Sequence, residues 1–477
     1  VSNETYVGLT DADFRATPRR RYIASERDRM EWHRTSLAVT HRARWPSGLE
    51  IATTLYRHDL ARTWNRVQGL RGADLSEVLA NPDSPRNRVF YGVLTGTLDS
   101  TTDAETILIG PNRRTFVSQG VQTVARLPAR TGPLTHRLEY GLRLHYDSID
   151  RLHTQTGYRV AGGALVPEGR AEETTTDNKA SAFAMAGHAL DALTWGSLTL
   201  TPGVRLEVIQ SQLDDRLANT RGSAVTVALL PGMGAHYALT RELGVLAGVY
   251  RGFSPPAPGE RGRREESSVN YEGGARWSSK VARFEAIGFY NDYSNITNVC
   301  TFSTGCDETQ LDRQADGGAA RIYGAEVFGE TSVPLGRALR LPLRVAYTFT
   351  ESEFLTSFSS SDPIFGTVQA GDAIPYVPPH QLSATAGLEA ERWALDASLL
   401  YVAAMRERAG RGDGPDALLT DESVVLDVSG SVRLLSWLRA YVNVRNVLDG
   451  QFVASRRPFG ARPNAPRWLQ AGLRAEF

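Results

Sequence analysis

Residues 198–208 read Leu-Thr-Leu-Thr-Pro-Gly-Val-Arg-Leu-Glu-Val, so apolar and polar side chains alternate along the stretch. Successive side chains of a β-strand point to opposite faces of its sheet, and this order gives the strand one apolar face and one polar face. The polar face carries Arg205 and Glu207, which suit a wet surface better than a packed core. The stretch therefore predicts a strand that lies between an apolar medium and water.

The same alternation recurs along most of the chain. We expect strands of about 10 to 14 residues, longer than the 5 to 6 of typical soluble strands and long enough for the 9 to 11 that cross a membrane. Counted in this way, about seventeen strands run from near Arg29 to Phe477. Further alternating stretches are 136–146, 382–389, 426–434, 438–445 and 469–477.

The connections between these strands alternate between short and long, as in outer-membrane barrels with short periplasmic turns and long extracellular loops. The short connections are 46–48, 194–196, 240–242, 278–279, 391–392 and 435–436. The long ones are 59–112, 148–178, 253–267, 292–317, 352–378, 405–421 and 448–463. We expect one helical turn at 74–80, inside the first long loop.

Tryptophans support this orientation. Five of the eight flank short turns, as an interfacial aromatic girdle requires. They are Trp45, Trp195, Trp277, Trp393 and Trp437. A large soluble β-sandwich is the alternative, but it would need shorter strands and turn signals every 8 to 12 residues or so. The fold class predicted is therefore all-β, a transmembrane antiparallel β-barrel.

The composition excludes several classes of protein. The 53 basic residues balance the 53 acidic ones, which gives no support to a nucleic-acid-binding protein. No stretch approaches the roughly 18 apolar residues of a transmembrane helix. The first residues lack the pattern of a signal peptide, which suggests a mature fragment or a truncated gene product. The His-Glu-x-x-His, Gly-x-Ser-x-Gly and phosphate-loop patterns are absent, so we expect no enzyme and no cofactor.

Two features inside the long loops are candidates for function. Cys300 and Cys306 are close enough in sequence to form a disulfide in an oxidising compartment. A metal site would need further ligands, and no histidine lies nearby to supply one. Arginines also gather in two loops, where they are either solvated or bind an anionic chelate through carboxylate groups. The candidate ligand-binding arginines are Arg261, Arg263, Arg264, Arg456, Arg457 and Arg462.

Several stretches resemble TonB-dependent receptors. Residues 446–449, 452–458 and 460–463 are similar to the last hairpin of that family, and Phe477 matches the aromatic C-terminal residue that is the family's outer-membrane assembly signal. Residues 250–256 with 265–266 and 270–272, then 317–318 with 322–326, and 375–382 match as well. Residues 4–14 and the Ser-Arg-Arg-Pro loop at 455–458 resemble the ferric-citrate receptor branch.

The resemblance implies a location in the cell outer membrane and uptake of a ferric chelate, ferric citrate or another siderophore-type complex. Family members capture the chelate with extracellular loops, complete the site with an N-terminal plug domain and release the chelate through the TonB complex. We interpret residues 1–477 as the barrel domain, N-terminally incomplete and without a plug, from a 22-stranded type of barrel. The alternatives are a passive outer-membrane channel and a TonB-dependent receptor for cargo other than iron.

Overall fold

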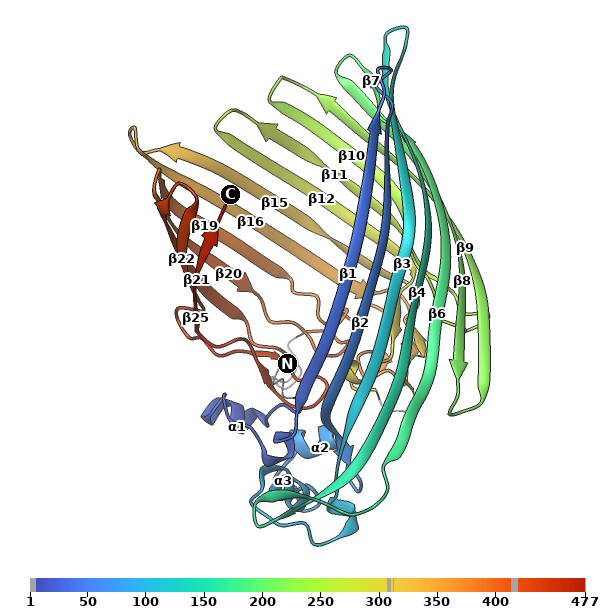
Figure 1. Ribbon diagram of the computed structural model, residues 1–477, viewed down its shortest axis with the longest axis vertical. Helices are drawn as coiled ribbons and strands as arrows, with labels where there is room; N and C mark the ends of the chain where they lie inside the picture. Colours follow the sequence, from blue (N-terminus) through green and yellow to red (C-terminus); the bar gives the residue numbers. More distant parts are fainter. Residues whose placement is uncertain (1–5, 307–309, 312, 413–418, 477) are drawn as a thin grey trace.

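The structure is a computed structural model that describes residues 6–306, 310–311, 313–412 and 419–476. The expected assembly signal, Phe477, lies outside the described residues. The chain forms one curved antiparallel sheet with short turns at one end and long loops, three helices and the N-terminal segment at the other (Figure 1). This is the antiparallel transmembrane barrel fold that the alternation predicts.

The main sheet has 19 strands, of which β5 (Ala164–Pro167) and β7 (Leu193–Trp195) are short additions. The other seventeen agree with the count made from the sequence. They are β1 (Arg29–Arg44), β2 (Glu50–Leu70), β3 (Ile107–Thr131), β4 (Leu134–Ala161), β6 (Glu173–Asp191), β8 (Leu198–Asp215), β9 (Thr220–Ala238), β10 (Leu243–Ser254), β11 (Glu266–Ser278), β12 (Ala282–Asn295), β15 (Ala320–Pro334), β16 (Leu339–Phe354), β19 (His380–Ala390), β20 (Trp393–Val402), β21 (Ser423–Leu435), β22 (Leu438–Arg445) and β25 (Trp468–Ala475).

The sheet has two edges within the described part of the chain. There, β1 pairs with β2 alone and β25 pairs with β22 alone, so the first and last strands of the sheet are not paired with each other. Both edge strands begin at the end with the long loops and run toward the short turns. Whether a plug domain belongs to this protein stays a prediction.

The apolar face of the sheet points outward. The loop after β12 reaches across the mouth, where its Phe302 contacts Arg66 of β2 and His153 of β4. A loop from a distant part of the sheet can touch β2 and β4 only on the concave face, so this face is the inner one. The opposite face carries apolar residues such as Val204 and Leu206, 43% and 45% exposed, which lie in no interior core.

The pairing register of neighbouring strands aligns these outward-facing residues in rows around the wall. One row runs through directly paired positions on seven strands: Val39, Leu55, Val121, Leu144, Met185, Val208 and Val227. The inner face carries polar pairs instead, for example Arg126 with Glu139 at 2.7 Å and Arg205 with Glu207 at 2.7 Å. An apolar outer wall faces lipid and a charged inner wall faces a wet lumen.

Two aromatic girdles mark the membrane boundaries. The five tryptophans predicted to flank the short turns all lie exposed at that end of the sheet. Toward the loop end, Tyr271, Tyr290 and Tyr323 sit in one row of β11, β12 and β15, with neighbouring ring centroids 6.3 Å apart. The short-turn end is therefore the periplasmic end, and the loop end is extracellular.

The expected strand length of about 10 to 14 residues is wrong for most of the wall, since nine of the seventeen strands have 15 to 28 residues and β22 and β25 have only eight. β2, β3 and β4 have 21, 25 and 28 residues, about twice the length that the alternation predicts. Their extracellular parts continue beyond the apolar band, because hydrogen bonding between neighbours can extend a strand into water. The first long loop accordingly shrinks from 59–112 to 71–106, and the second from 148–178 to short connections around β5.

The extracellular loops have a core of their own. Helices α1 (Asp11–Ala16), α2 (Leu75–Ala80) and α3 (Asn87–Thr95) pack there, and Asp74 caps the expected helix α2 by accepting a hydrogen bond from the Glu77 amide at 2.8 Å. Buried residues of this core include Phe14, Val78 and Leu94. None of the helices in the described residues is long and apolar enough to cross a membrane.

The remaining elements are short pieces within loops. The strands are β13 (Thr297–Val299), β14 (Gln314–Asp316), β17 (Phe358–Ser359), β18 (Thr367–Val368), β23 (Val453–Ser455) and β24 (Arg462–Pro463). The 3-10 helices are η1 (Ile23–Ser25), η2 (Asp103–Glu105) and η3 (Phe302–Thr304). They shape the loops that converge over the mouth.

Candidate functional site

The N-terminal segment, residues 6–28, docks on the last extracellular loop. The Gly8 amide donates to the Phe459 carbonyl at 2.6 Å, and Leu9 exchanges backbone hydrogen bonds with Ala461. The two chains approach so closely that a Cβ on Gly8 would lie 2.5 Å from the Gly460 carbonyl oxygen, which only glycine tolerates. Segments from the two ends of the described chain therefore share one extracellular structure.

Asp28 anchors this segment to the wall. Its carboxylate accepts hydrogen bonds from the amides of Tyr6 at 2.8 Å and Val67 at 3.1 Å, and the residue is buried. Burial raises the pKa of Asp28 to about 6, although these two backbone hydrogen bonds act in the opposite direction. We therefore expect the attachment of the segment to depend on pH.

Arginines form a row on the inner wall just below the loops. Arg62 of β2, Arg114 of β3 and Arg151 of β4 occupy directly paired positions, so their side chains share the lumen face. Arg151 donates to Asn178 at 3.1 Å, and Arg114 donates to the His153 ring at 3.2 Å. We call Arg62, Arg114 and Arg151 the arginine row. It concentrates positive charge at the extracellular end of the lumen.

Arg66 follows Arg62 by four residues on the same face of β2, on the extracellular side of the row, and is fully buried. Its guanidinium carbon lies 4.0 Å from the centroid of the Tyr6 ring and 4.2 Å from that of Phe302. Asn112, with its amide oriented to offer the oxygen, accepts from Arg66 at 2.7 and 2.9 Å. A guanidinium between two aromatic faces binds by cation–π attraction, so Arg66 holds the N-terminal segment and the disulfide loop against β2.

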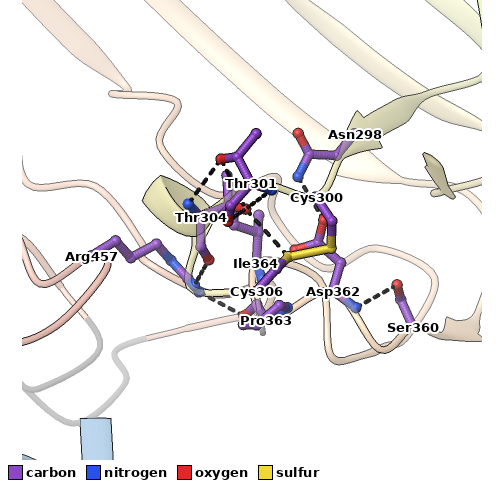
Figure 2. The surroundings of a disulfide bond; sticks show 10 residues. All are labelled: Asn298, Cys300, Thr301, Thr304, Cys306, Ser360, Asp362, Pro363, Ile364 and Arg457. Atoms are coloured by element: carbon purple, nitrogen blue, oxygen red, sulfur yellow. Dashed lines mark hydrogen bonds between the residues drawn. A yellow bond between two sulfur atoms is a disulfide. The ribbon is translucent and has the colours of Figure 1, made fainter. Parts of the chain in front are cut away.

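The disulfide loop, residues 300–306, is closed by the bond between Cys300 and Cys306 (Figure 2). Both cysteines are buried, so the loop is tucked into the mouth and does not form an exposed tip. Next to it, Asn298 donates to the buried Asp362 at 2.6 Å. The two sulfurs and the Asp362 carboxylate lie within 4.8 Å of one another, but sulfurs joined to each other are not thiolate metal ligands.

Arg457 joins three loops at this point, and Figure 2 shows its bonds to two of them, at Thr304 and Pro363. Its guanidinium donates to the carbonyls of Thr304 at 2.6 Å, Pro363 at 2.6 Å and Glu407 at 3.1 Å. Burial lowers the pKa of Arg457, although nearby acidic groups oppose the shift. The side chain therefore serves as a cross-link between the disulfide loop, the 360–366 loop and the 405–412 loop.

Arg456 faces carboxylates. Its Nε and one Nη donate to the two oxygens of Asp11, each at 2.9 Å, and its other Nη donates to Glu407 at 3.2 Å. Burial acts to lower the pKa of Arg456, but hydrogen bonds and charge from Asp11 and Glu407 outweigh it and raise the pKa. Burial also raises the pKa of Glu407, against the opposing effect of Arg456. The site is built for a carboxylate.

The other predicted ligand-binding arginines lie in different surroundings. Arg261 donates to the Ser223 carbonyl at 2.8 Å, and Arg263 pairs with Glu260 at 3.2 Å and Asp316 at 3.3 Å. Arg264 is exposed, whereas Arg462 of β24 is partly buried. The two predicted groups come from different extracellular loops. Both reach the β12–β15 connection, Arg263 through Asp316 and Arg457 through Thr304.

The sequence did not predict the arginine row. Each of its members lies on the lumen-facing side of its strand, but their proximity depends on the pairing register of β2, β3 and β4. The predicted long loops 59–112 and 148–178 include Arg62 and Arg151, so two of the three arginines were assigned to loops and only Arg114 to a strand. No local pattern in the sequence marks the arginine row, because the strands do not alternate between apolar and polar residues at these positions.

A curved antiparallel sheet with an apolar outer face, a charged inner face and two aromatic girdles defines an outer-membrane β-barrel protein. Residues 2–447 match the TonB dependent receptor-like β-barrel family, and the chain belongs to that family. It is an outer-membrane protein and not an enzyme, since members of this family are transporters.

Solved structures with this fold include receptors for different cargo. The ferric citrate transporter FecA in the unliganded form has a TM-score of 0.69 and 16% identity, over 98% of this chain and 65% of that one. The ferric-catecholate import receptor Fiu from E. coli K12 gives 0.69 and 15%, over 98% and 68%. The copper transporter OprC gives 0.62 and 13%, over 94% and 66%. The chain spans just under two thirds of FecA's length, and these likenesses concern the fold.

Proposed function

We propose that this protein is the barrel of a TonB-dependent transporter that takes up an anionic ferric chelate, such as ferric citrate, across the outer membrane. The observation that carries the proposal is the arginine row. Three guanidinium groups in register on the lumen wall give a concave, positively charged surface beneath the loops. Such groups bind carboxylates in a bidentate manner through charge-assisted hydrogen bonds, which are roughly twice as strong as neutral ones.

The loop arginines of the sequence analysis belong to the same proposal. Arg456 lies in a carboxylate-binding arrangement, and Arg261, Arg263, Arg264 and Arg462 add positive charge to the extracellular end. Arg457 acts by holding the loops together around the site. In this proposal a plug domain would complete the site from below, and a TonB complex would drive release, as the family resemblance implies.

The alternative functions receive less support. A passive channel needs an open lumen, whereas Phe302, Tyr6 and Arg457 pack loops across the mouth. A receptor for cargo other than iron remains the second candidate, because the fold is shared with a copper transporter. The arginine row favours an anionic complex over a free cation, since three guanidinium groups repel positive charge.

The test is iron uptake by a full-length receptor that contains this chain. Arg62→Gln, Arg114→Gln and Arg151→Gln together should reduce uptake of ferric citrate at least tenfold and leave uptake of an uncharged ferric trishydroxamate unchanged. The control is Arg337→Gln, Arg340→Gln and Arg392→Gln together, which makes the same change of charge at exposed positions near the periplasmic turns. Equal ferric citrate uptake by both variants, at normal surface expression, would refute the proposal. A second variant with Arg456→Ala, Arg457→Ala and Arg462→Ala tests the loop arginines in the same assay.

A further inference from the structure

The carboxylate-binding arrangement at Arg456 is already occupied by the protein itself. Asp11, the first residue of α1, offers both carboxylate oxygens to the Nε and Nη2 of Arg456, each at 2.9 Å. This is the fork-to-fork geometry in which arginine binds a free carboxylate. The two residues are far apart in sequence, so the contact exists only because the N-terminal segment docks on the last loop.

The two partners differ in their exposure. The Asp11 side chain is 47% exposed, whereas the Arg456 side chain is only 14% exposed. On its other side, Arg456 donates to the buried Glu407 at 3.2 Å and to the Leu419 carbonyl. The guanidinium therefore stays aimed in one direction when Asp11 turns away. The carboxylate is the partner that can leave, and a change of its side-chain rotamer is sufficient.

We infer that Asp11 is an intramolecular competitor, which fills the place of a ligand carboxylate on Arg456 until an anionic chelate displaces it. This inference rests on the proposed function and assigns one binding position within it. The ligand class is a complex with at least one free or peripheral carboxylate. Asp11 keeps the guanidinium paired in the absence of ligand, and an incoming carboxylate restores the same two hydrogen bonds after the exchange.

The exchange is energetically accessible. Ion pairs with an exposed partner are weak, and a pair of this kind shifts an equilibrium by up to about fivefold. Competition by Asp11 should lower the apparent affinity for a carboxylate ligand by the same factor, since the binding-competent state is only partly populated. The N-terminal segment stays attached meanwhile, because Arg15 pairs with Asp421 at 2.7 Å and Arg19 pairs with Asp449.

The experiment is a calorimetric titration of the purified chain in detergent with citrate as the probe, at fixed ionic strength. Asp11→Asn keeps the size of the side chain and removes its charge, so citrate should bind about three to five times more tightly than to the wild type. A purely structural clasp predicts the opposite sign or no change, because its loss would loosen the loops around the site. The direction of the effect separates the two roles.

Two further variants control the result. Asp449→Asn removes one negative charge and breaks the Arg19 pair, but does not touch Arg456, so it should change the affinity by less than about 1.5-fold. Arg456→Gln should weaken citrate binding. In the Arg456→Gln background, Asp11→Asn should have no further effect, because the competitor then has nothing to block.

Each outcome bears on one of the two proposals. If citrate binds the wild type and Asp11→Asn equally, or if Asp449→Asn tightens binding as much as Asp11→Asn does, the competitor role is overturned while the proposed function stands. If citrate binds and Arg456→Gln has no effect, the assignment to Arg456 is overturned as well. If neither the wild type nor Asp11→Asn binds citrate, the proposed function and this inference both fail.

Discussion

Replacing Arg457 with alanine should release the disulfide loop from the other extracellular loops. In the native structure the Arg457 guanidinium donates to the carbonyls of Thr304, Pro363 and Glu407, at 2.6, 2.6 and 3.1 Å. A hydrogen bond to a charged group contributes about 1.5 to 3 kcal/mol, and the three bonds are not additive because they share one donor group. We therefore expect the free energy of loop opening to fall by about 3 kcal/mol.

Hydrogen–deuterium exchange with mass spectrometry measures this quantity. A loss of about 3 kcal/mol corresponds to exchange about a hundredfold faster in peptides that cover 298–306 and 364–369, provided that closing outpaces exchange. Arg457→Lys keeps the charge but cannot bridge three carbonyls with one planar group, so its effect should be intermediate. Arg261→Ala, an exposed arginine bonded to Ser223, should leave both peptides unchanged. Less than threefold faster exchange in Arg457→Ala would refute the cross-linking role.

Three other predictions concern the anchor, the outer wall and the inner wall. The pKa of Asp28 is about 6 in the folded protein and about 3.9 in an unfolded chain, so its stabilising contribution is full below a pH of about 4 and is lost as the pH rises through 6. Backbone amides of the N-terminal segment should therefore exchange hydrogen for deuterium faster at pH 7 than at pH 4.5, after correction for intrinsic rates. Asp28→Asn should abolish this difference. Leu206→Arg places a charge in lipid and should lower the free energy of unfolding in vesicles by about 2 to 4 kcal/mol, whereas an unchanged value would place this residue outside the membrane. Gly120→Ala puts a Cβ 2.4 Å from the Leu144 carbonyl oxygen and should lower the free energy of unfolding, measured by urea titration, by about 1 to 3 kcal/mol. The control is Gly273→Ala, whose Cβ has its nearest neighbour at 3.7 Å and which should change little.

Local sequence information was sufficient for the wall of the barrel. The alternation at 198–208 predicted which side chains face lipid, because a strand has only two faces. A shift of the strand by one residue would turn its charged side chains toward the membrane. The short turns and their tryptophans predicted the orientation for the same reason, since both depend on residues adjacent in sequence. The disulfide prediction also needed only six residues of separation, and the structure joins Cys300 to Cys306.

The lengths of β2, β3 and β4 were not predictable in this way. Their extracellular parts leave the membrane, so no alternation between lipid and water marks them, and only pairing with a neighbour makes them strands. The same limit hid the arginine row, whose members lie 37 to 89 residues apart and meet through register alone.

The sequence by itself therefore determined the class of fold, the direction of the residues in the alternating stretches and the family, because each depends on a periodic or contiguous pattern. Tertiary structure alone decided what the loop arginines contact. Arg456 and Arg457 are neighbours in sequence, yet one faces the carboxylate of Asp11 and the other faces three backbone carbonyls. Extracellular loops carry no repeating pattern, and their partners come from distant segments brought together when the sheet curves. The physical reason is that the period of a strand fixes which side chains face lipid, whereas the surroundings of a loop depend on which distant segments the curved sheet brings beside it.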